Sequence, residues 1–374
     1  MPSPTGPGAA EPFLVTGANG RVHLSWLEPA PDSSFAFKVA AFEGTRWTTP
    51  TTVRTGRDFF VNWADFPSLE AFGANGLAAH WLQRNGTDKY AYSVKIVVSR
   101  DGGASWGAPV TPHTDMSPTE HGFVAMWPEG DGIGAAWLDG RRYDKSKPNP
   151  PNEMSVASTN ISATGARGVE AILDTRACDC CQVAAAVTTD GPMVAYRDRS
   201  SDEIRDIAVA RRVDGAWTQP RLVNADGWHI AACPVNGPAL SASGTKVALA
   251  WFTAARDTAR VNVAFSSDAG ATFSAPVRVD GGAPAGRVDV ALLADGSALV
   301  SWIERVGDAA AVRARRVTPQ GRAGEPATIA ASSASRASGF PRLTLSGDRV
   351  YFAWTEPTRP SAVRVARMAI SALR

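Results

Sequence analysis

The chain lacks the features that mark several common classes of protein. Basic and acidic side chains nearly cancel over its 374 residues, leaving a net charge of +2, and no segment concentrates positive charge. A nucleic-acid-binding surface is therefore not indicated. No apolar run is long enough to span a bilayer, and no long helical periodicity occurs. Cysteine and histidine are scarce, at four and five residues.

What the sequence does contain is a short apolar strand ending in an aromatic residue, repeated seven times. The aromatic residues are Trp26, Trp81, Trp137, Tyr196, Trp251, Trp302 and Trp354. Successive gaps are 55, 56, 59, 55, 51 and 52 residues. Regular units of this size are typical of a closed or stacked array of supersecondary elements.

Each unit has the pattern of four short strands. Val247, Leu249 and Trp251 alternate with small residues, which is a strand period and not a helical one. A second short strand precedes this one and ends in a glycine turn, and two more follow it. Four antiparallel strands in about 50 residues describe one blade of a β-propeller. The sequence therefore predicts an all-β fold.

The length of the repeat favours seven blades. A six-bladed propeller is the alternative, but it would leave one whole unit unplaced, whereas seven units fall only slightly short of complete. We expect the shortfall to appear as a missing outer strand on the first or last blade. An open β array is a further alternative, although closure removes exposed sheet edges. We expect residues 11–374 to form a single propeller domain and residues 1–10 to be a disordered linker.

Two turns between predicted third and fourth strands carry a recognisable motif. They read Ser99-Arg-Asp101-Gly-Gly103-Ala-Ser105-Trp106 and Ser266-Ser-Asp268-Ala-Gly270-Ala-Thr272-Phe273. Both resemble the Asp box of sialidase-like (BNR-repeat) β-propellers. In such a turn the aspartate accepts backbone N–H groups and the glycine permits positive φ. The resemblance implies a sialidase-like fold.

The resemblance does not extend to a sialidase active site. Sialidases resemble one another in an arginine triad, a tyrosine–glutamate pair and an aspartate acid/base. The five tyrosines of this chain are poorly placed for that role: Tyr196 replaces a repeat tryptophan, and only Tyr143 lies in a loop that could face the axis. The predicted seventh blade also departs from the six of sialidases. We therefore expect the fold without sialidase activity.

The repeat aromatic places the cysteines in a common register. Cys178 lies 18 residues before Tyr196, and Cys233 lies 18 before Trp251. Cys180 lies 16 before Tyr196, as His121 lies 16 before Trp137. Cys181 is adjacent, and His229 precedes Cys233 by four residues. Because equivalent positions of neighbouring blades meet at one end of the channel, we expect these side chains at one axial mouth.

Two interpretations of this cluster stay open. Cys178, Cys180, Cys181 and Cys233, with His121 and His229, could bind a metal ion; soft sulfur ligands favour copper first and zinc second. Alternatively the even number of cysteines forms structural disulfides, such as Cys178–Cys233. Either interpretation suits a bacterial periplasmic or secreted protein whose signal or lipid anchor was removed upstream.

Charged residues after the second strands should face the same mouth. Asp198, Asp257, Glu304, Arg197 and Arg256 are weak candidates for catalysis. Together they could form a polar funnel for an anion or a glycan. The alternative function is therefore a glycoside hydrolase or a glycan-binding propeller with disulfide-bonded cysteines. A protein partner would also fit such a scaffold.

Overall fold

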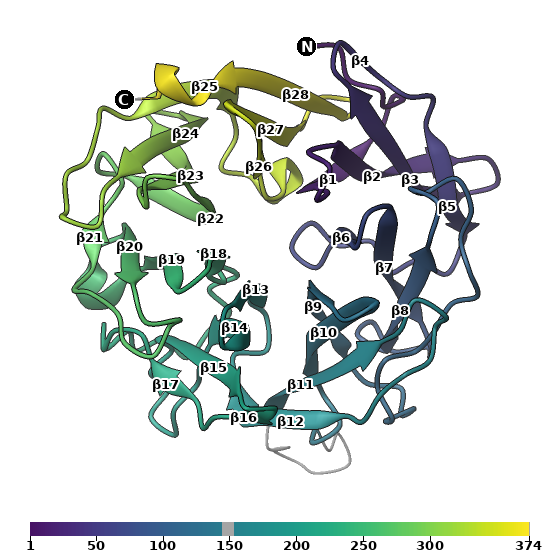
Figure 1. Ribbon diagram of the computed structural model, residues 1–374, viewed down its shortest axis with the longest axis horizontal. Helices are drawn as coiled ribbons and strands as arrows, with labels where there is room; N and C mark the ends of the chain where they lie inside the picture. The colour runs from purple at the N-terminus through teal and green to yellow at the C-terminus, as the bar shows by residue number, and fades with distance from the viewer. Residues whose placement is uncertain (144–152, 374) are drawn as a thin grey trace.

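Seven antiparallel sheets stand in a ring around one axis in the computed structural model, which describes residues 1–143 and 153–373 (Figure 1). Blade 1 contains β1 (Ala10–Thr16), β2 (Val22–Ala30), β3 (Ser34–Glu43), β4 (Arg46–Trp47) and β5 (Thr51–Gly56). Blade 2 contains β6 (Ser68–Phe72), β7 (Gly76–Arg84) and β8 (Tyr92–Ser99). Blade 3 contains β9 (His121–Glu129), β10 (Gly132–Asp139), β11 (Met154–Ile161) and β12 (Ala171–Ala177).

The remaining blades follow in sequence order around the ring. Blade 4 contains β13 (Ala184–Thr188), β14 (Gly191–Arg197), β15 (Ile207–Val213), β16 (Ala216–Trp217) and β17 (Arg221–Leu222). Blade 5 contains β18 (Ala239–Ser243), β19 (Lys246–Thr253), β20 (Arg260–Ser266) and β21 (Val277–Arg278). Blade 6 contains β22 (Pro284–Leu292), β23 (Ala298–Val306), β24 (Ala309–Val317) and β25 (Ala327–Ser332). Blade 7 contains β26 (Arg342–Ser346), β27 (Arg349–Glu356) and β28 (Ala362–Ala369). The prediction of seven blades is confirmed.

Short 3₁₀ turns supply the only helical segments in the described part of the chain. They are η1 (Ala255–Asp257), η2 (Arg336–Ser338) and η3 (Ile370–Ala372). Within the described residues, no helix has the length and apolar character needed to cross a membrane.

The repeat aromatics occupy the second strand of every blade. Trp26, Trp137, Tyr196 and Trp302 are fully buried, and Trp81 and Trp251 are 1 % exposed. Each packs among aliphatic residues of its own and neighbouring blades; Trp302, for example, contacts the cluster that contains Val261, Val288 and Val300. The alternation in the sequence therefore reflects side chains that point in turn to the two faces of the sheet, both of which are buried.

Several second-strand tryptophans donate their indole N–H to an acid two residues further on. Because side chains two apart lie on the same face of a strand, Trp26 Nε1 reaches Glu28 Oε2 at 2.7 Å and Trp137 Nε1 reaches Asp139 Oδ2 at 2.8 Å. Trp302 donates to Glu304 in the same way. A buried indole N–H needs an acceptor. These acids therefore act as hydrogen-bond acceptors for tryptophans in the interior of the blades.

Polar side chains near the first strands join four pairs of neighbouring blades. Four such contacts join an acceptor to a backbone N–H about one repeat later: Asp65 to Phe123 at 2.6 Å, Gln182 to Gly237 at 3.0 Å, Asn236 to Arg287 at 2.7 Å and Asp289 to Leu343 at 2.8 Å. We call these contacts the inter-blade clips. They fix the first strands around the axis.

Blades 7 and 1 close the ring without sharing a sheet. Thr16 Oγ1 and Thr344 Oγ1 are 2.9 Å apart, and Gly8 N donates to Ser361 O at 2.8 Å. Blade 7 has three strands, so the outer strand expected to be incomplete is missing there. Residues 1–10 were expected to be a disordered linker; in the structure Ala9 is fully buried at this junction and Ala10 is the first residue of β1.

The two turns with the Ser-x-Asp motif have the same internal hydrogen bonds. Asp101 Oδ1 and Asp268 Oδ1 each accept a backbone N–H four residues later at 2.9 Å. Ser99 Oγ and Ser266 Oγ each accept a glycine N–H, at 2.8 and 2.9 Å. The motif is therefore a self-contained turn that follows the third strand of blades 2 and 5.

Candidate metal centre

A tight turn between β12 and β13 presents three cysteines at once. Cys178 N donates to Arg197 O at 2.9 Å, which anchors the start of the turn to the end of β14. Ala177 also forms an isolated bridge with Asp198. The turn is thus held beside the end of the second strand of blade 4, at the mouth that the register predicts.

The sulfur atoms of the turn lie at distances suited to a shared ion. Cys178 Sγ is 3.4 Å from Cys181 Sγ and 3.8 Å from Cys180 Sγ. A metal with bonds of about 2.3 Å to tetrahedrally placed sulfurs would separate them by about 3.8 Å, whereas a disulfide bond is about 2.05 Å long. We call Cys178, Cys180 and Cys181 the inner group; their ligand atoms all lie within 4.8 Å of one another.

A buried guanidinium contacts the inner group. Arg205 Nη1 lies 3.2 Å from Cys178 Sγ, and its side chain is 4 % exposed. Glu203 orients it, with Oε2 at 2.9 Å from Arg205 Nη2. Burial opposes ionisation of Cys178, but contacts from Cys180 and Cys181 and the Arg205 charge hold its pKa well below the usual thiol range. A low thiol pKa favours metal binding, because the thiolate is the ligand.

A second guanidinium adds positive charge behind the turn. Arg197 is 1 % exposed and donates to the carbonyl oxygens of Asn236, Arg205 and Phe252. Its Cζ lies 4.8 Å from the Trp228 ring centroid. Burial and the neighbouring Cys178 raise the pKa of Cys181, and the Arg197 charge partly offsets this.

Cys233 approaches from the loop that leads to blade 5. Its Sγ lies 3.8 Å from Asp179 Oδ1. Asp179, Cys180 and Cys233 have ligand atoms within 4.8 Å of one another; we call them the outer group. Contact with Cys180 lowers the pKa of Cys233 although partial burial opposes it. All four cysteines are unpaired in the structure and meet at one mouth.

The two histidines predicted with the cysteines lie elsewhere. His121 Nε2 is 3.1 Å from Asp115 Oδ2, and its ring stacks on His113 with centroids 4.0 Å apart. Asp115, His121 and Asp139 form a further group with metal-ligand spacing. Arg141, however, already binds both oxygens of Asp139 at 2.7 Å. The geometry therefore favours an ion-pair network over a cation site.

His229 is exposed and pairs with Ile204 through a backbone bridge. Among residues 1–143 and 153–373, it belongs to none of the groups with metal-ligand spacing. A spacing of four residues brings two side chains together on a helix, but residues 229–233 form no helix and contain two bends.

The residues predicted as weak catalytic candidates do not form one funnel. The guanidinium of Arg197 donates its hydrogen bonds to backbone carbonyl groups. The carboxylate of Glu304 accepts hydrogen bonds from the indole of Trp302 and from Ala283 N. Arg256 and Asp257 lie in the exposed η1 turn. Burial raises the pKa of the Asp198 carboxyl to about 6, although a hydrogen bond from the backbone N–H of Arg199 lowers it.

An acidic network that the sequence analysis missed lies at the same mouth. Tyr92 Oη lies within hydrogen-bond distance of two carboxyl groups, 2.6 Å from Glu120 Oε1 and 3.1 Å from Asp65 Oδ2. Burial raises the pKa of Asp65 to about 7 and that of Glu120 to about 8. Asp65 stands 16 residues before Trp81, the spacing of Cys180 and His121 from their own aromatics. The same register would have found it.

Gly122 lets this network approach the backbone. A Cβ at that position would lie 2.1 Å from Asp65 Oδ2, so any side chain would displace the carboxylate. Phe123, whose N–H is the Asp65 clip donor, has φ of +53°. The start of β9 is therefore bent to receive Asp65.

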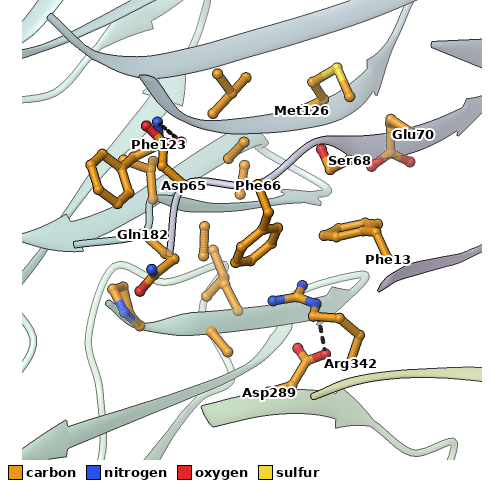
Figure 2. Close-up of a pocket in the computed structure, with 18 of the residues that line it drawn as sticks. Phe13, Asp65, Phe66, Ser68, Glu70, Phe123, Met126, Gln182, Asp289 and Arg342 are labelled. Atoms are coloured by element: carbon orange, nitrogen blue, oxygen red, sulfur yellow. Dashed lines mark hydrogen bonds and ion pairs between the residues drawn. The ribbon is translucent and has the colours of Figure 1, made fainter. Parts of the chain in front are cut away.

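Below the mouth lies a cavity of about 120 Å³, drawn in Figure 2. Arg342 extends across it, with Cζ 4.5 Å from the Phe13 ring centroid and Nε 3.3 Å from Asp289 Oδ2. Phe66 and Glu70 also line the cavity. Ligand pockets usually hold about 300–1,000 Å³. The cavity suits a few water molecules, and a sugar ring would have to bind outside it.

No protein-family model and no curated protein matches the sequence. Several solved structures share its architecture. A protein of unknown function from Dyadobacter fermentans is 14% identical, with a TM-score of 0.52 over 96% of this chain and 93% of that one. The Hadza microbial sialidase Hz136 is 12% identical, with a TM-score of 0.50 over 91% and 74%. The α-L-arabinofuranosidase Arb93A of Fusarium graminearum is 11% identical, with a TM-score of 0.54 over 98% and 94%. At these identities the likeness shows the fold alone: the chain folds as a β-propeller similar to those of these proteins.

Proposed function

We propose that the protein binds a soft metal ion, copper(I) first and zinc second, through the thiolates of Cys178, Cys180 and Cys181. The observation that carries this proposal is the convergence of three sulfur ligands within 4.8 Å on one short turn. Thiolates select copper(I) and zinc over hard cations. The proposal places the protein outside the bacterial cytoplasm, and recovery of the full-length product in the cytosolic fraction would contradict that placement.

Buried positive charge beside the inner group compensates part of the charge of a metal–thiolate complex. Three thiolates around a monovalent ion leave a charge of −2, and around a divalent ion a charge of −1. Arg205, which contacts Cys178, and Arg197 behind the turn supply two buried positive charges. A buried complex is stable only when its charge is compensated. Glu203 and Asp179 pair with Arg205 and add negative charge, so the soft sulfur ligands, and not the charge balance, place copper(I) ahead of zinc.

The test is metal binding by the purified chain under anaerobic, reducing conditions. We expect one tightly bound copper(I) ion per chain, with affinity reduced about 100-fold or more in Cys178→Ser, because losing a direct ligand costs at least as much as losing an outer contact. Met116→Ser is the matched control, since this thioether is 66 % exposed and lies outside the cluster.

Cys181→Ser provides a second variant in case Cys178→Ser folds poorly, and far-UV circular dichroism checks the fold of each. If the wild-type chain binds neither copper(I) nor zinc, or if Cys178→Ser and Cys181→Ser bind as tightly as the wild type, the proposal is wrong. Mass mapping that finds all four thiols oxidised in the native protein would instead support the structural disulfides.

A further inference from the structure

The four cysteines form two overlapping ligand groups and not a single shell. The inner group comprises Cys178, Cys180 and Cys181, and the outer group comprises Asp179, Cys180 and Cys233. Cys180 belongs to both. A ligand shared by two adjacent groups can hold an ion in either one, so the geometry contains two neighbouring positions for a soft ion.

The solvent exposure of the cysteines rises from the inner group to the outer group. Cys178 and Cys181 are each 1 % exposed. Cys180 is half-buried, and Cys233 is exposed together with its neighbours Ala231 and Ala232. The outer group therefore faces solvent while the inner group lies beneath it.

The inner sulfurs are covered on their other sides. Arg205 lies on Cys178 and is itself 4 % exposed, held by Glu203. Cys180 packs against the core cluster that contains Val183 and Tyr196. A buried metal site needs a path by which the ion arrives. Cys233 is the one exposed cysteine of the four, so we expect the ion to arrive over Cys233.

We propose that the outer group is the loading position of the metal site, from which the ion passes to the inner group by exchange at Cys180. This inference rests on the proposed function. The partner that fits Cys233 is a copper(I) complex of a soft sulfur donor, either a small thiol or a thiolate-bearing protein.

The exchange needs no change of oxidation state. A copper–sulfur bond to the donor breaks as a bond to Cys233 Sγ forms, and the Cys233 thiol proton passes to the departing donor thiolate. The bond to Cys180 then forms, and bonds to Cys178 and Cys181 replace the bond to Cys233. The protons displaced from Cys180 and Cys181 leave to solvent, and Cys233 takes up a proton from solvent and is free to accept another ion.

The experiment follows uptake of copper(I) from its bicinchoninate complex, and from its glutathione complex as the thiol donor, by stopped-flow absorption without oxygen. We expect Cys233→Ser to slow uptake about 10-fold or more while final occupancy stays within about twofold of the wild type, because rate and equilibrium depend on different ligand groups. Ala232→Ser, the exposed neighbour, is the control for a serine in this loop.

Each other result has a separate meaning. If Cys233→Ser fills as fast as the wild type, the loading position is wrong and the metal site stands. If Cys233→Ser loses bound copper at equilibrium, Cys233 is a resident ligand and the inference is again wrong. If the wild-type chain takes up no copper, the proposed function fails and the inference fails with it.

Discussion

The carboxyl group of Glu70 shows how a buried position beside the axis changes the pKa of a single side chain. Glu70 lies on β6 and lines the cavity of Figure 2. Burial raises its pKa to about 8, although Ala71 N–H, at 3.0 Å from Oε1, stabilises the ionised form. The group is therefore mostly protonated at neutral pH in the folded protein and ionised in the unfolded chain.

Glu70→Gln should accordingly stabilise the protein at alkaline pH. A folded pKa above the unfolded value contributes stability that is complete below about pH 4.5 and is lost as pH rises through about 8. We expect the variant to match the wild type near pH 4.5 and to exceed it by on the order of 1–3 kcal/mol at pH 9, a value reduced because the cavity admits water. Denaturant unfolding at both pH values measures this. An equal difference at the two pH values would contradict the shifted titration.

At the scale of elements, the inter-blade clips explain how short first strands keep their places. Asn236 precedes β18 and accepts Arg287 N–H from β22, while its own carbonyl accepts two bonds from Arg197. Arg287 has φ of +58°, and Gly286 beside it leaves room for the amide. The clip therefore joins blade 5 to blade 6 and also supports the guanidinium behind the cysteine turn.

Asn236→Ala should lower the free energy of unfolding by about 1–3 kcal/mol, because the buried Arg287 N–H loses its acceptor. Thermal and urea unfolding give the difference. Asn19→Ala is the control, since Asn19 accepts only a local N–H in an exposed turn. Equal stability of the Asn236 variant and the wild type would show that the clip is not needed.

At the scale of the whole molecule, the ring is closed by packing between blades 7 and 1. Tyr351 on β27 is 5 % exposed, and its ring meets that of Phe42 edge-on with centroids 5.6 Å apart. Both belong to one cluster with Leu14, Trp26 and Val363, drawn from the two ends of the chain. Figure 1 shows these ends side by side in the ring.

Tyr351→Ala should destabilise the protein by about 3–5 kcal/mol, as for other large buried aromatic residues. We expect unfolding to remain a single transition by circular dichroism and tryptophan fluorescence, because all seven blades share the ring. Leu222→Ala is the control, since Leu222 is 48 % exposed. A separate early transition in the variant would show that blades 1 and 7 open independently.

The sequence by itself determined the repeat, the blade count and the meeting of the cysteines. These follow from local periodicity: alternation buries Trp251 and its equivalents, and equal spacing from these aromatics places Cys178, Cys180 and Cys233 at one mouth. Because the strands are short and regular, residues at the same distance from the repeat aromatic occupy equivalent positions in the folded blades.

Only the tertiary structure decided what each mouth residue contacts. His121 shares the register of Cys180 but stacks on His113 and binds Asp115, because the loop that precedes β9 brings these two partners to its ring. Arg205 and Glu203 come from a loop with no fixed spacing, and their contact with Cys178 depends on how that loop folds over the sulfur. Glu304 was predicted as a funnel residue, but its carboxylate accepts the indole N–H of Trp302 inside the blade. Periodicity fixes the position of a residue on a blade, whereas partners from other blades fix its chemistry.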